Sequence, residues 1–176
     1  RNLKKGYGYI EEIHAPLQNL AAREVYGIDT RVEIGDSFGS AGKLSLAIEH
    51  SHILQFKEEG FPGAGLKETL DERNKPRWRN ATTLTYALSG HGISLTARTV
   101  AGQKKTDPSR GRLPNYTEYD TQYSYAAPLN GQFVLGATNV TGATPPRDNS
   151  TPQSQVEPEI YDQIGRTYYA GYTQNF

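Results

Sequence analysis

The chain has 176 residues, with nineteen basic and nineteen acidic side chains and a formal net charge of zero. This balance argues against an electrostatic nucleic-acid binder, and the absence of cysteine excludes disulfides and thiolate metal sites. No run of about eighteen apolar residues occurs, so the sequence predicts no transmembrane helix.

Period-two alternation predicts a series of β-strands along most of the chain. Residues 5–12 allow a short first strand, and 14–22 are expected to form a loop. In 24–34, Ile28, Val32 and Ile34 fall on one face, and charged residues fall on the other. The further alternating segments are 43–54, 77–88, 93–98, 117–125 and 161–176. The sequence also predicts a strand at 133–140, without fixing which of its residues face which side.

Tight turns and long polar connections alternate between these strands. Short turns are expected at 36–42, 89–92 and 128–131. Long loops are expected at 56–76, 102–114 and 141–159, the first with room for a brief helix at 65–73. This strict order is typical of an up-and-down membrane barrel, with its turns at one rim and its loops at the other. A sandwich with Greek-key crossovers has no reason to alternate in this way.

The alternation sorts the strand residues into an apolar or aromatic face and a polar face. Aromatic residues expected to face lipid or to form interface girdles are Trp78, Tyr86, Tyr119, Tyr123, Tyr125, Tyr168 and Tyr172. Leucines expected on the same lipid-facing side are Leu46, Leu84 and Leu95. Polar residues expected to face a wet lumen are Asp29, Arg31, Arg98, Glu118, Asp120 and Gln122.

The end of the chain resembles a known family. Gly165-Arg166-Thr167-Tyr168-Tyr169, followed by a terminal Phe176, resembles the closing strand of the TonB-dependent receptors of Gram-negative outer membranes. Upstream, 25–29 resembles that family's Gly-hydrophobic-acid strand, and 114–120 resembles its Tyr-x-x-x-Asp strand entry. Residues 136–140 resemble its Gly-Val-x-Asn-Leu segment, with Val140 in the Leu position. Each motif is weakly specific, but their order and spacing are jointly specific.

The resemblance implies an all-β protein, an antiparallel up-and-down transmembrane β-barrel segment of about seven or eight strands. The family's barrel has about 22 strands and a plugged lumen, so 1–176 would be its C-terminal part, without the N-terminal plug. Phe176 would belong to the signal read by the barrel-assembly machinery. The other implied partners are outer-membrane lipid, TonB through the plug, and a small nutrient ligand. The implied function is the energised import of a scarce nutrient, such as a siderophore-iron complex.

Two other interpretations stay open: a surface-exposed β-sandwich that binds, for example, carbohydrate, and a small autonomous outer-membrane barrel, with or without enzyme activity. His50 and His52 share a strand face and could chelate a metal, although interface-level polar residues explain them more simply. Glu118 and Asp120 lack a third catalytic group. Because no nucleophile elbow or phosphate loop occurs, we expect no catalytic site and no cofactor. The zero net charge is the reason that we expect no nucleic-acid partner.

Overall fold

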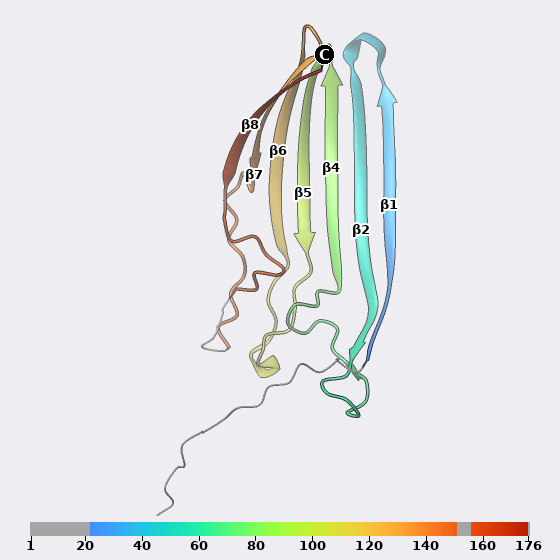
Figure 1. The fold of residues 1–176 in the computed structure, drawn as a ribbon, viewed down its shortest axis with the longest axis vertical. Helices are drawn as coiled ribbons and strands as arrows, with labels where there is room; N and C mark the ends of the chain where they lie inside the picture. The colour runs from blue at the N-terminus through green and yellow to red at the C-terminus, as the bar shows by residue number, and fades with distance from the viewer. Residues whose placement is uncertain (1–21, 151–155, 176) are drawn as a thin grey trace, which may run out of the picture.

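The computed structural model describes residues 22–150 and 156–175. They form an eight-stranded antiparallel sheet in which seven strands follow the order β1-β2-β4-β5-β6-β7-β8. These strands are β1 (Arg23–Ser37), β2 (Lys43–Glu58), β4 (Trp78–Leu88), β5 (His91–Val100), β6 (Tyr116–Ala127), β7 (Gly131–Thr138) and β8 (Thr167–Gln174). A two-residue strand, β3 (Lys67–Glu68), pairs with β2. Figure 1 shows the long strands side by side, from β1 at one edge to β8 at the other.

The connections alternate as the sequence predicts. The short turns 38–42, 89–90 and 128–130 lie together at one end of the sheet, which we call the turn end (Figure 1). The connections 59–77 and 101–115, and the described parts 139–150 and 156–166 of the third connection, lie at the opposite end, the loop end. The turns include the 3-10 helix η1 (Gly39–Ala41), and the second long loop includes η2 (Pro108–Arg110). The up-and-down order of the described strands is therefore confirmed.

The prediction of a brief helix at 65–73 is wrong. Lys67 and Glu68 instead extend along the end of β2, and the Thr69 N–H donates to the Phe56 carbonyl at 2.8 Å. Asp71 follows with φ 68°, a left-handed conformation that no α-helix tolerates. The charged residues of this stretch are compatible with a helix. Its backbone instead pairs with the end of β2 and then forms a tight turn.

The outermost strands, β1 and β8, leave the sheet open. Within the described residues, β1 pairs with β2 alone and β8 with β7 alone. The all-β antiparallel class is confirmed, while closure into a barrel is not part of the described structure. The strand expected at 5–12, most of the loop at 14–22, and Phe176 lie outside the described residues. No helix among the described residues is long and apolar enough to cross a membrane.

The buried side chains gather at the loop end rather than behind the sheet. Leu70, Leu113, Tyr116 and Tyr161 are between 2% and 7% exposed. By contrast, large apolar residues along the strands remain exposed, with Ile34 at 61% as an example. No second sheet covers them in the described part of the chain, so the arrangement lacks the packed second layer of a β-sandwich.

Candidate functional site

One side of the sheet, here called the apolar face, carries most of the large hydrophobic strand residues. Directly paired residues of antiparallel strands share a face, and one such row runs from Leu46 through Leu84 to Leu95. A second row joins Ile93, Tyr123 and Leu135. The pairing places all the expected lipid-side residues on this face: Leu46, Trp78, Leu84, Tyr86, Leu95, Tyr119, Tyr123, Tyr125, Tyr168 and Tyr172. The register also fixes the orientation of β7, with Phe133, Leu135 and Ala137 on the apolar face.

Aromatic residues of the apolar face form a belt at the turn end. The Tyr86 hydroxyl donates to the Ala41 carbonyl at 2.6 Å. His91 stacks on Tyr125 with ring centroids 4.8 Å apart, and its Nδ1 lies 2.6 Å from the Tyr123 hydroxyl. These polar tips on apolar rings suit a boundary between hydrocarbon and water.

A second cluster of rings lies on the apolar face toward the loop end. His50 stacks on Trp78 with ring centroids 5.9 Å apart, and the His50 and His52 centroids are 6.0 Å apart. Within 22–150 and 156–175, no group of three or more His, Cys, Asp or Glu side chains is placed to hold a metal ion. Through these ring contacts, His50, His52 and Trp78 form a second ring belt on the apolar face.

The opposite side, the polar face, carries paired charges. Arg98 lies 3.2 Å from the Glu118 carboxylate and 2.9 Å from that of Asp120. Arg31 lies 2.9 Å from the Glu49 carboxylate. The strand pairing places all the residues expected on the lumen side on this one face: Asp29, Arg31, Arg98, Glu118, Asp120 and Gln122. Since Arg98 forms ion pairs with both Glu118 and Asp120, the geometry gives no support for these carboxylates as a catalytic acid pair.

The third long loop folds back over the polar face at the loop end. Tyr161 is 2% exposed and meets the Tyr116 ring edge-on, with centroids 5.3 Å apart. The Gln103 amide donates to the Tyr161 hydroxyl at 3.3 Å. Burial raises the pKa of Tyr161, so this hydroxyl stays neutral. Glu157 pairs with Arg73 of the first long loop, which ties all three long loops together.

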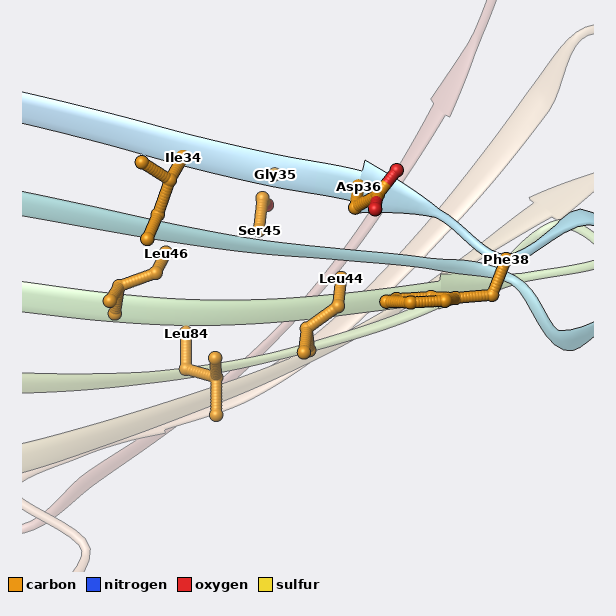
Figure 2. A pocket seen from close by; sticks show the side chains of 8 residues that line it. All are labelled: Ile34, Gly35, Asp36, Phe38, Leu44, Ser45, Leu46 and Leu84. Carbon is orange, nitrogen blue, oxygen red and sulfur yellow. The ribbon is translucent and has the colours of Figure 1, made fainter.

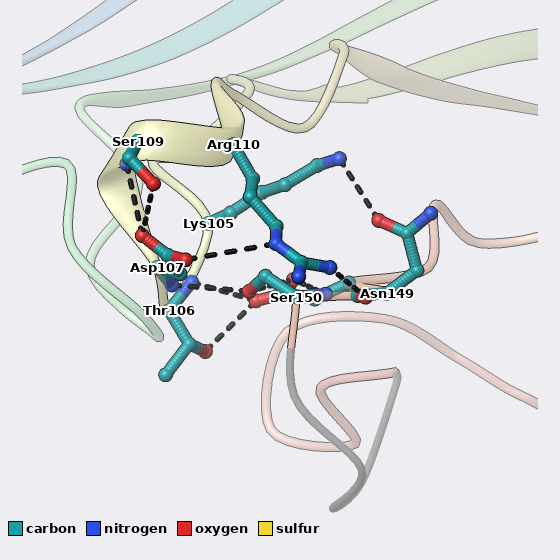
Figure 3. A network of polar contacts seen from close by, with 8 residues as sticks. Lys105, Thr106, Asp107, Ser109, Arg110, Asn149 and Ser150 are labelled. Atoms are coloured by element: carbon teal, nitrogen blue, oxygen red, sulfur yellow. Dashed lines mark hydrogen bonds and ion pairs between the residues drawn. The ribbon is translucent and has the colours of Figure 1, made fainter.

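A carboxylate clamp joins the second and third long loops (Figure 3). Asp148 accepts the Thr106 backbone N–H at 2.7 Å and its hydroxyl at 2.8 Å. It also accepts the Ser150 N–H at 2.9 Å. Burial alone would raise the pKa of Asp148, but the hydrogen bonds from Ser150 and Thr106 outweigh burial and hold this pKa below its usual range. The clamp fixes the two loops as one unit.

A polar cavity of about 410 Å³ lies between the polar face and the inward-folded third loop. Arg79, Arg98, Glu118 and Tyr161 are among the residues that line it. Arg79 has no ion-pair partner among the residues that the structure describes. The mixture of guanidinium, carboxylate and phenol groups suits a polar ligand held by hydrogen bonds.

Sequence reasoning missed the contacts that hold the loops together. The available signal was the repeated Asp-x-Ser pattern, at Asp107–Ser109 and at Asp148–Ser150, in which a side chain caps its own turn. The pattern predicts local turns, but it does not predict that Asp107 N–H would also donate to Ser150 of another loop at 3.0 Å.

No family model matches this chain, and neither a curated protein nor a solved structure matches it. The likeness to TonB-dependent receptors stays a hypothesis from sequence motifs. A function has to account for three features: the exposed apolar face with its two ring belts, the ion-paired polar face, and the interlocked loop end.

Proposed function

We propose that this chain is part of the transmembrane barrel of an outer-membrane receptor that imports a scarce nutrient. The carrying observation is the exposed apolar face bounded by ring belts at both ends. On β4, Trp78 and Tyr86 stand eight residues apart, which is about 27 Å along a strand and about 20 Å across a bilayer at a tilt of about 45°. That span is close to the apolar band of about 25 Å on outer-membrane barrels.

The open edges support a larger closed sheet. In hydrocarbon, each unpaired backbone N–H or carbonyl of an edge strand costs several kcal/mol. Because β1 and β8 lack outer partners within the described residues, a lipid-facing sheet of this form requires further strands on both edges. A small autonomous barrel would instead need β8 to pair with a strand near the start of the chain.

Two features, the polar face and the loop end, support the proposed transport role. Charges on that face are paired across neighbouring strands, as Arg98 is with Glu118, and such pairs suit a lumen that contains water and a plug. The cavity beside Arg79 and Tyr161 offers groups for a polar ligand. The resemblance adds the energy source, TonB acting through a plug domain, and a siderophore-iron complex as the nutrient class.

The topology is tested with single cysteines in the full-length protein, since residues 1–176 contain no cysteine of their own. Glu72→Cys lies in the first long loop and Ser40→Cys in the first turn. A membrane-impermeant maleimide applied to intact cells should label Glu72→Cys. Ser40→Cys should react only after the outer membrane is permeabilised. Equal labelling of both on intact cells, or recovery of the protein in the soluble fraction, contradicts the proposal.

Import is tested separately in a strain that lacks the gene. Uptake of a siderophore-iron complex by the complemented strain should depend on TonB. If the protein inserts into the membrane but its loss changes no nutrient uptake, the barrel assignment stands and the proposed transport role is wrong.

A further inference from the structure

An open apolar groove lies at the turn end of the apolar face (Figure 2). It has a volume of about 390 Å³. Apolar side chains from β1, the first turn, β2 and β4 line it: Ile34, Phe38, Leu44, Leu46 and Leu84. The Phe38 ring extends along the groove toward Leu44, and Phe38 is 56% exposed. No described segment of the chain covers these side chains, so the groove is accessible to an apolar chain from outside.

Asp36 is a carboxylate in the lining of this mostly apolar groove. It pairs with Leu44 across the hairpin, which places it on the apolar face between Ile34 and Phe38. Its Oδ1 accepts the Ser37 N–H at 2.8 Å. Among the described residues it has no cationic partner. A carboxylate beside apolar surface is costly to desolvate unless a cation pairs with it.

We propose that the groove holds an acyl chain of a phospholipid whose headgroup carries a primary ammonium, and that Asp36 pairs with this ammonium. This proposal rests on the proposed function, because the groove meets a bilayer only if the apolar face does. The Tyr86 and Tyr125 belt lies at the same end of the sheet, which places Asp36 at headgroup depth.

The chemistry favours an ammonium lipid over the other headgroups. A carboxylate repels the phosphate of an anionic lipid with a glycerol headgroup. A primary ammonium offers three N–H donors to the Asp36 oxygens, whereas a quaternary choline group offers none. Charge complementarity and hydrogen bonding therefore select the same partner.

The test places the full-length protein in vesicles of matched phosphatidylethanolamine and phosphatidylcholine content. After gentle detergent extraction, native mass spectrometry counts the lipids that remain bound. The wild type should retain phosphatidylethanolamine over phosphatidylcholine. Asp36→Asn should reduce that preference about threefold, as expected for a solvent-accessible ion pair. Phe38→Ser should reduce retention of both lipids at this site.

Two controls match these variants. Asp29→Asn removes a carboxylate of the same strand on the opposite face, and Phe61→Ser removes a 68% exposed phenylalanine of the first long loop. Neither should change lipid retention. If the protein inserts into vesicles but shows no ethanolamine preference, or keeps it in Asp36→Asn, this proposal alone is overturned. If flotation shows that the protein does not insert, the lipid-facing assignment is overturned together with it.

Discussion

At the scale of single residues, Gly136 shows how the polar face accommodates a large ring. Gly136 pairs with Tyr169 across β7 and β8, and a Cβ at Gly136 would overlap the Tyr169 ring. The ring lies over the glycine and donates from its hydroxyl to Gln122 at 3.0 Å. Such packing of an aromatic ring on a strand glycine links three strands.

Gly136→Ala should therefore destabilise the protein by about 1–3 kcal/mol, the usual cost of overpacking. Gly171→Ala is the matched control, because Gly171 lies on the same face, pairs with Val134 and has no atom within 4 Å of its ideal Cβ. The control should be neutral or slightly stabilising. Urea unfolding in detergent measures both, and equal stability of the two variants would contradict the packing role of Tyr169.

Asp148 provides a prediction for pH. Its pKa is lower in the folded protein than in the unfolded chain, so the folded state binds the proton less tightly. The stabilisation is complete above the unfolded pKa of about 3.9 and is lost as the pH falls through the folded value. Asp148→Asn should lower Tm by about 2–4 °C at pH 7. The Tm difference from the wild type should stay constant down to about pH 5 and shrink below about pH 4. A difference that grows on acidification would contradict this assignment.

At the scale of elements, the turn between β6 and β7 carries strain. Leu129 and Asn130 both have φ 59°, the left-handed pair of a hairpin turn. Asn is well suited to this conformation and Leu is not, and Leu129 is 86% exposed, so packing does not compensate.

Leu129→Asn should stabilise the protein by about 1 kcal/mol. Leu129→Ala lacks the side-chain amide with which Asn hydrogen-bonds the local backbone in this conformation. It should therefore keep the strain, and it serves as the control. Chemical unfolding in micelles distinguishes them, and an Asn variant no more stable than the Ala variant would show that the turn is relaxed.

The two faces of β5 give a sharper test of the membrane assignment. Leu95 lies on the apolar face and Thr96 on the polar face, where its hydroxyl contacts that of Thr83 at 2.9 Å. Leu95→Arg should make insertion into the bilayer less favourable by about 2–4 kcal/mol, whereas Thr96→Arg should have a far smaller effect. Refolding yields into vesicles measure the pair. Equal losses would contradict a lipid-facing side.

Residue alternation was sufficient to predict the seven long strands and the faces of all of them except β7, because a half-exposed strand has a period of two. It missed β3, and it began the last strand at Tyr161, which lies in the third long loop. It underestimated β1 and β2, which extend to the Arg23–Glu58 pair, since a shift of register next to Gly27 breaks the period while pairing continues. The loop contacts escaped prediction for a different reason. Asp148 and Thr106 are 42 positions apart, and no local pattern encodes a contact between two irregular segments.

At the scale of the whole molecule, the outer edges of β1 and β8, which have no partner among the described residues, lead to a prediction for the full-length protein. If further strands flank β1 and β8, the backbone amides of β1 that point away from β2 are hydrogen-bonded in the assembled barrel. Hydrogen exchange of the full-length protein in detergent should show those amides as protected as the amides of β5. Rapid exchange along β1 would mean that the edge is free and that no barrel closes there.

The order of the sheet, in which neighbours in space are neighbours in the chain, also has a kinetic consequence. Contacts between consecutive strands have a short sequence separation, and low contact order favours rapid folding. The β4–β5 and β6–β7 pairs, each joined by a tight turn, are suited to form early as independent hairpins. By contrast, β8 joins β7 across the longest connection between described strands, 139–166. We therefore expect β8 to pair late in folding, using the edge of the β6–β7 hairpin as its template.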